Sequence, residues 1–235
     1  MKAVGVIGYK KSGKTTLVIR LSQELSRMGY SVAILKHVSG SIDFPHTDTS
    51  KFRAHAAFVS AVSPKESEII LKGRKRIEDI LTYFTCDIVL VEGFKEEKTF
   101  PKIVCVLQPG DEEKLFNGLE LFTASFNKAI SDFTIEDDGH VKKMAAIVSE
   151  KSFKLPNLNC GHCGYESCFE FAKEIVKGKK SIANCVSLNP PISIKVDGVE
   201  FPLNPFMSNL FKNSFSAMLS SLKGFKKGRI EIDIP

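Results

Sequence analysis

The feature that most constrains the fold is a glycine-rich loop near the N-terminus, Gly8-Tyr9-Lys10-Lys11-Ser12-Gly13-Lys14-Thr15, which fits the pattern G-x-x-x-x-G-K-[ST] at every required position. An apolar, β-branched run at residues 3–7 precedes the loop, and apolar residues at helical spacing follow it between residues 15 and 28. A strand that enters such a turn and leaves it as a helix surrounds phosphate oxygens with backbone N–H groups and a positive helix end. The sequence therefore predicts a phosphate-binding loop (P-loop).

Individual residues of this loop have distinct expected roles. Lys14 is expected to place its charge between the β- and γ-phosphates, and the Thr15 hydroxyl is the expected Mg²⁺ ligand. The other expected nucleotide contacts in this segment are Gly8, Tyr9, Lys10, Lys11, Ser12, Gly13 and Thr16. Tyr9 stands where loops of the MinD and nitrogenase-iron-protein type carry a second lysine. An ATP-driven electron-transfer dimer of that type is therefore disfavoured.

The rest of the chain predicts an α/β fold of the P-loop NTPase kind, followed by two smaller parts. Strands are expected at residues 31–35, 57–62, 68–71, 88–91, 103–107 and 119–123, and helices at 48–57, 76–84 and 140–150. Continuous apolar strands that alternate with helices indicate a mostly parallel sheet covered by helices on both faces. We expect a P-loop domain at 1–152, a small four-cysteine metal domain at 157–189 and a short α+β unit at 190–235. In the last unit we expect a hairpin turning at Asp197-Gly198, a helix at 205–222 and a strand at 229–234.

Two other predicted strands end in charged residues, which would lie near the phosphates because ligands bind beyond the carboxyl ends of parallel strands. Glu92 follows one strand and occupies the place of the acid that holds Mg²⁺ directly or through water. Lys36 and His37 follow the other, where an exposed loop is the alternative. Asp87 lies at the amino end of its strand, so we expect a structural role. Lys14 and Glu92 are therefore the predicted catalytic residues.

Residues 1–150 resemble the molybdopterin-guanine dinucleotide biosynthesis protein B family. The resemblance lies in Gly8–Thr16, Lys36-His37, Asp43, Asp48-Thr49, Arg53, Ala56-Ala57, Val91-Glu92-Gly93-Phe94-Lys95 and Pro101-Lys102-Ile103. It implies a homodimeric GTP-binding protein with weak GTP hydrolysis, which assists the guanylyltransferase that joins GMP to molybdopterin. It also implies nucleotide contacts at Asp48 and Gly93.

The segment between residues 38 and 57 departs from the family pattern. Val38-Ser39-Gly40-Ser41 stands where the family often has further histidines, Thr47 replaces a common lysine, and His55-Ala56-Ala57 replaces Ala-Gly-Ala. The guanine motif N-K-x-D is also missing, because the run from Asn127 to Asp132 has one residue too many. Guanine specificity is therefore implied by the resemblance alone.

Four of the six cysteines fall within 26 residues, as C-x₂-C-x₄-C at Cys160, Cys163 and Cys168, with Cys185 after 16 more residues. Three thiolates on one loop, with a fourth later in the sequence, favour a [4Fe–4S] cluster. The alternative is a Cys₄ zinc site, which usually takes its ligands from two C-x₂₋₄-C pairs. The segment also resembles the four-cysteine domain of corrinoid iron–sulfur proteins and redox-complex subunits, which implies a [4Fe–4S] cluster. Cys86 and Cys105 sit singly in apolar runs and are expected to be buried thiols.

Composition and charge bear on which partners the protein binds and where in the cell it acts. The net charge is +6, and its excess lies in short C-terminal lysine runs, so an exposed basic face is favoured over nucleic-acid binding. No stretch approaches the roughly 20 apolar residues of a membrane span, and the N-terminus does not resemble a signal peptide, so we expect a cytoplasmic protein.

The leading hypothesis is an accessory GTPase of molybdenum or tungsten cofactor maturation. The alternatives are a nucleotide-gated iron–sulfur electron donor or cluster carrier, and a small-metabolite kinase.

Overall fold

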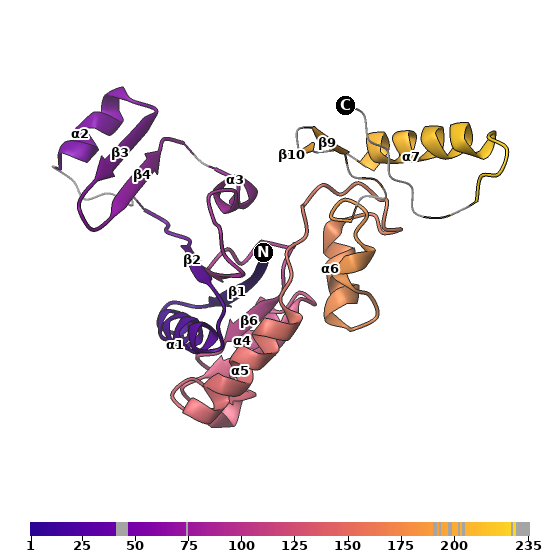
Figure 1. The fold of residues 1–235 in the computed structure, drawn as a ribbon. Helices are drawn as coiled ribbons and strands as arrows, with labels where there is room; N and C mark the ends of the chain where they lie inside the picture. Colours follow the sequence, from indigo (N-terminus) through magenta and orange to yellow (C-terminus); the bar gives the residue numbers. More distant parts are fainter. Residues whose placement is uncertain are drawn as a thin grey trace. The chain divides into compact units, whose positions relative to one another are not determined.

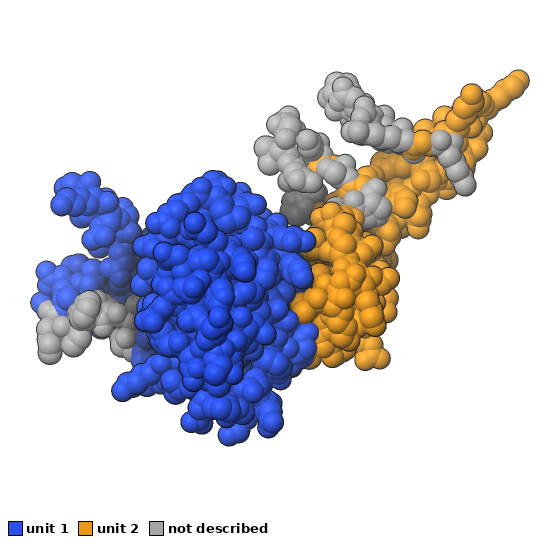
Figure 2. All heavy atoms as spheres, turned by 90° about the horizontal axis from the view of Figure 1, so that it is seen from below, with its two compact units in different colours: residues 1–154 blue, residues 155–235 orange. Residues whose placement is uncertain are grey.

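The computed structural model describes residues 1–40, 47–73, 75–189, 192, 194–196, 199–201, 203, 205–226 and 228. Within it the chain forms two compact units, residues 1–154 and 155–235 (Figure 2). Asp43, the predicted boundary at Pro190-Pro191, the predicted turn at Asp197-Gly198 and the predicted strand at 229–234 lie outside the described residues. The finer division of the second unit stays a prediction.

Unit 1 is built on a parallel sheet with the strand order β2-β5-β1-β6-β7-β8 (Figure 1). The strands are β1 (Lys2–Gly8), β2 (Val32–Lys36), β5 (Ile88–Glu92), β6 (Lys102–Cys105), β7 (Glu120–Ser125) and β8 (Phe133–Thr134). The side chains of β5 and β6 are buried along their whole length. This accounts for their continuous apolar sequence and confirms the predicted mostly parallel sheet.

Helices cover both faces of this sheet. Successive side chains of β1 point to opposite faces and are apolar on both, so each face needs a helix to cover it. Val4 and Val6 pack into a core with buried side chains of α1 (Lys14–Arg27) and α5 (Asp138–Lys151). On the other face, Ala3 packs with α3 (Ile77–Leu81), and Ile7 packs with Leu115 of α4 (Asp111–Leu115). The predicted two-sided covering is thus confirmed.

Two predicted strands form a sheet of their own. β3 (Phe58–Val62) and β4 (Ser67–Leu71) pair antiparallel, and α2 (Asp48–His55) precedes them. The sequence patterns did not predict α4, β8 or the 3₁₀ turn η1 (Lys128–Ile130), because segments of two to five residues are too short to show periodicity.

Unit 2 holds the cysteine segment and the C-terminal elements. Its elements are α6 (Cys168–Val176), the 3₁₀ turn η2 (Ile182–Asn184), the antiparallel pair β9 (Ile194–Val196) and β10 (Val199–Phe201), and α7 (Pro205–Ser220). Phe171 and Ala172 of α6 are buried.

Lys102 at the start of β6 is completely buried. Its ammonium group donates a hydrogen bond to the backbone carbonyl of Lys95, in the loop that follows β5. Burial lowers the pKa of Lys102 to about 8, against the opposing effect of nearby Glu120, Glu96 and Glu97. The lysine therefore fastens that loop to the sheet at the cost of burying a charge.

We predict that the stability of the wild type relative to a Lys102→Met variant increases between pH 8 and pH 10.5. In this range the unfolded chain, whose lysine has the ordinary pKa of 10.5, keeps a proton that folded Lys102 has lost, so the free energy of unfolding rises with pH. Urea denaturation at several pH values measures the difference. Lys114→Met, at an exposed position, is the control for the loss of one positive charge. A wild-type advantage that stays constant across this range would contradict the prediction.

Candidate nucleotide site and cysteine centre

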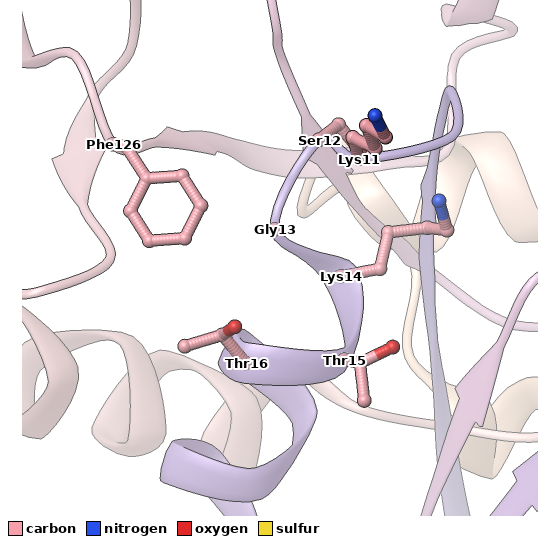
Figure 3. A pocket seen from close by; sticks show the side chains of 7 residues that line it. All are labelled: Lys11, Ser12, Gly13, Lys14, Thr15, Thr16 and Phe126. Carbon is pink, nitrogen blue, oxygen red and sulfur yellow. The ribbon is translucent and has the colours of Figure 1, made fainter.

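A pocket of about 230 Å³ lies at the loop between β1 and α1, lined by residues 11–16 and by Phe126 (Figure 3). Gly13 has a φ of +88°, and an added Cβ there would lie within 3 Å of the side chains of Ile135 and Phe126. A Cβ on Gly8 would similarly meet the Ser12 hydroxyl and the Cys105 carbonyl. The tight turn therefore requires glycine at both positions of the motif.

The loop offers hydrogen-bond donors that the described part of the protein leaves free. No side chain caps the start of α1, where the N-cap is Gly13. The Ser12 hydroxyl is buried and has no hydrogen-bond partner among the described residues. Because buried polar groups are normally paired, a loop with an unpaired hydroxyl beside an uncapped helix start fits an anionic ligand such as phosphate.

Lys14 bends back over its own loop, where its ammonium group donates to the Tyr9 carbonyl at 2.6 Å. Its pKa is lowered, chiefly by burial and further by the charges of Lys95 and Lys36, while Cys105 and Glu92 act in the opposite direction. Lys14 therefore lies in a cluster of positive charge around one buried carboxylate.

That carboxylate belongs to Glu92, the last residue of β5. The Thr15 hydroxyl donates to its Oε2 at 3.0 Å, and Lys36 Nζ lies 3.2 Å from its Oε1. Lys36 stands opposite Glu92 in the β2–β5 register, and β5 directly adjoins β1. The structure thus brings Thr15, Lys36 and Glu92 together even though β2 does not flank β1. Hydroxyl and carboxylate oxygens are the ligands that Mg²⁺ prefers, so the donor set fits this ion.

The loop after Glu92 packs against the P-loop and β2. Gly93 has a φ of +92°. The His37 and Phe94 rings pack edge to face, with their centroids 4.9 Å apart. The Lys95 ammonium lies 4.2 Å from the centre of the Tyr9 ring, in a cation–π contact. His37 and Gly93 therefore shape this loop in the structure. Their predicted contact with nucleotide stays a prediction.

The positions of three further residues bear on their predicted roles. Asp48 pairs with Lys51 at 2.9 Å within α2, where both side chains are exposed, so its nucleotide contact stays a prediction. Lys10 is exposed on the loop. Asp87 accepts hydrogen bonds from the Ser31 backbone N–H and hydroxyl at 2.8 and 2.6 Å, a structural role at the amino end of β5.

The four clustered cysteines lie on the loop before α6, at its start and just after η2. Cys168 and Cys185 are buried, whereas Cys160 and Cys163 are half-buried. Burial raises the pKa of the Cys185 thiol, and neighbouring Cys168 and Cys163 raise it further. Burial opposes ionisation of Cys160, but hydrogen bonds with Ser187 and His162 lower its pKa to about 7. Of the other two thiols, Cys105 is buried as expected, and Cys86 is only half-buried.

The chemistry of these thiols fits a metal centre, although their side chains are not gathered around a point. Among the described residues, no group of three or more His, Cys, Asp or Glu side chains is arranged to hold a metal ion. Gly161 and Gly164 have φ values of +72° and +85°, and an added Cβ would meet no atom within 4 Å at either. Because thiolate sites generally form together with their metal, a soft donor set on an open, glycine-bent loop is compatible with one.

Comparison with known families decides the classification. The family model for molybdopterin guanine dinucleotide synthesis protein B, MobB, matches residues 3–124. The chain belongs to the MobB family. A second model, described as "Putative Fe-S cluster", matches residues 155–187, so the MobB part is followed by a domain of that family.

Individual relatives support this organisation. A "Putative molybdopterin-guanine dinucleotide biosynthesis adapter protein" of Methanocaldococcus jannaschii is 33% identical over 246 residues, covering 100% of this chain and 98% of the relative. A "Probable molybdopterin-guanine dinucleotide biosynthesis adapter protein" of Bacillus subtilis is 32% identical over 122 residues, covering 48% of this chain and 69% of the relative. The crystal structure of Bacillus subtilis MobB has the same fold, with a TM-score of 0.53 and 22% identity, over 63% of this chain and 98% of that one.

The MobB fold places two side chains at the P-loop that the motifs did not single out as site residues. Lys95 belongs to the Val91–Lys95 segment, and its place over Tyr9 depends on the turn at Gly93. Phe126 follows β7 and carries no motif of its own. Only the carboxyl-end rule for parallel strands could have drawn attention to it.

None of the helices in the described part of the chain is long and apolar enough to cross a membrane.

We predict that Gly13→Ala destabilises unit 1 more than Gly29→Ala does. Both glycines have left-handed φ values, +88° and +92°, so both variants incur the backbone cost of about 1–2 kcal/mol. Only Gly13 would also push against Ile135 and Phe126, since an added Cβ at Gly29 meets nothing within 4 Å. Thermal unfolding of the two variants measures the difference. Equal losses would show that Phe126 and Ile135 do not pack tightly on the P-loop.

Proposed function

We propose that this protein binds GTP·Mg²⁺ and acts as an adapter in the formation of molybdopterin guanine dinucleotide. One observation carries the nucleotide part: an uncapped helix start and an unpaired buried Ser12 hydroxyl lie in the same pocket as Lys14 and Thr15. Family membership carries the biosynthetic part, because relatives bear the adapter name, one of them over the whole chain.

In the proposed complex, Lys14 turns from the Tyr9 carbonyl to the β- and γ-phosphates, while backbone N–H groups of residues 13–16 surround the phosphate oxygens. Thr15 and Glu92 hold Mg²⁺, which neutralises phosphate charge. Glu92 already accepts from Thr15 and pairs with Lys36, so it is poorly placed to remove a proton from water. This supports slow hydrolysis and an adapter role for the GTP-bound protein.

The proposed partners follow from the adapter role. They are a molybdopterin guanylyltransferase and molybdopterin itself, with the protein acting as a homodimer.

For the cysteine unit we propose a [4Fe–4S] cluster held by Cys160, Cys163, Cys168 and Cys185. The three-plus-one spacing and the family match at residues 155–187 support iron over Zn²⁺. The same ligands would serve the second candidate function, a nucleotide-gated electron donor or cluster carrier. That function requires the rate of cluster reduction or transfer to change when GTP binds.

We predict that calorimetric titration shows tighter binding of GTP·Mg²⁺ than of ATP·Mg²⁺, and that Lys14→Ala abolishes both. Lys14 contacts the Tyr9 carbonyl rather than the core, so the variant should keep cooperative unfolding. Equal or tighter binding of ATP would contradict the proposed role in guanine dinucleotide formation.

Glu92→Gln and Asp87→Asn make a matched pair for the same titration, because each neutralises one carboxylate of β5 at opposite ends. Glu92→Gln should weaken the Mg²⁺ dependence of binding, since an amide is a poorer ligand for a hard cation. Asp87→Asn should leave binding unchanged and lower only the stability, through its bonds to Ser31. A larger loss of binding from Asp87→Asn would reverse the assigned roles.

We predict that protein purified without oxygen is brown and carries about four iron atoms, as a single [4Fe–4S] cluster requires. Single changes of Cys160, Cys163, Cys168 or Cys185 to Ser should sharply lower the iron content, because a hydroxyl replaces a soft thiolate poorly. Iron analysis and the absorption spectrum provide the measurement.

Cys86→Ser and Cys105→Ser are the matched controls and should keep the iron content, because both residues belong to unit 1. The variant that lacks all four ligands should still bind GTP through residues 1–154. Colourless anaerobic protein with one tightly bound zinc would establish the zinc alternative instead.

A further inference from the structure

The strand order separates two kinds of chemistry on either side of β1. Glu92 and Lys36 end β5 and β2, which lie on one side of β1 in the order β2-β5-β1-β6-β7-β8. Phe126 directly follows β7, on the other side. The charged, cation-binding end of the site and the aromatic ring therefore approach the P-loop from opposite directions.

Figure 3 shows the same division around the loop. The Phe126 ring and the Thr16 side chain lie on one side of the backbone at Gly13, whereas Lys14 and Thr15 point to the other side. The residues that suit the γ-phosphate and Mg²⁺ are therefore separated from the ring by the width of the loop. A triphosphate whose terminal phosphate lies beside Thr15 and Glu92 would extend its nucleoside toward Phe126.

Phe126 is held in place but not buried. The Ser125 hydroxyl accepts from the Asn127 backbone N–H at 3.1 Å, and the Asn127 side-chain oxygen accepts from Ala129 N–H at 3.0 Å, which fixes the turn after β7. One edge of the ring packs against Gly13. The residue nevertheless stays 44% exposed and lines the pocket. A half-exposed aromatic ring that lines a phosphate site is more than packing requires.

We propose that Phe126 stacks on the purine base of the bound nucleotide, an inference that rests on the proposed binding of a nucleoside triphosphate. Every purine presents a π-face, so this contact raises the affinity for GTP and ATP alike and does not select between them. Guanine selectivity then has to come from groups that reach the edge of the base. Phe126 is in this sense a binding residue for the nucleoside and not for the phosphates.

Calorimetric titration of Phe126→Ala with three probes tests the contact: GTP·Mg²⁺, ATP·Mg²⁺ and inorganic tripolyphosphate. We expect about a tenfold loss of affinity for both nucleotides, as for other base–aromatic stacks, and no loss for tripolyphosphate. Phe126→Tyr should restore nucleotide binding because it keeps the ring. Phe116→Ala is the matched control, since Phe116 is 45% exposed but does not line the pocket.

A spectroscopic test follows from the absence of tryptophan in the chain. Phe126→Trp introduces a single tryptophan, whose emission can be excited apart from that of the tyrosines and should change when GTP is added and stay constant with tripolyphosphate. Unchanged nucleotide affinity in Phe126→Ala would overturn the stacking proposal alone, and so would an equal loss for tripolyphosphate, which would make the ring a support for the loop. Failure of the wild type to bind any nucleotide would overturn the proposed function and this inference together.

Discussion

The nucleotide site depends on one buried carboxylate. Glu92 ends a strand whose neighbours on either side carry the P-loop and Lys36, and it receives the Thr15 hydroxyl and the Lys36 ammonium. Buried polar groups are normally paired, and the pairing of β1, β5 and β2 in this register is what brings both partners to Glu92. In the proposed complex Mg²⁺ takes over from the Thr15 hydroxyl as a partner of this group.

A second layer of contacts fixes the loop that follows Glu92. Lys102 donates to the Lys95 carbonyl, the Lys95 ammonium lies over the Tyr9 ring, and the Phe94 ring contacts the His37 ring. These contacts tie three separate parts of the chain to one another: the P-loop, the end of β2 and the start of β6. A residue such as His37, which a motif places at the phosphates, therefore has a packing role that its position in the sequence does not reveal.

The cysteine unit illustrates a different relation between sequence and structure. Its ligand pattern is clear in the sequence, whereas its thiols are not gathered into a metal-binding geometry in the structure. Thiolates repel one another until a cation joins them, so such a site takes its final geometry with the metal. An added Cβ at Gly161 or Gly164 would meet no atom within 4 Å, so the loop that carries Cys160 and Cys163 is open at both glycines.

The sequence by itself determined the P-loop, the parallel sheet covered on both faces and the three-plus-one cysteine pattern. These depend on local signals: required glycines, continuous apolar strands and fixed spacing. Only the tertiary structure decided that Lys36 pairs with Glu92 from the neighbouring strand β2, which does not adjoin β1, that β3 and β4 form a separate sheet, and that Phe126 lines the P-loop pocket. Strand order and register bring together residues more than a hundred positions apart, such as Gly13 and Phe126. No local pattern encodes strand order or register, because they arise from packing the whole sheet between its helices.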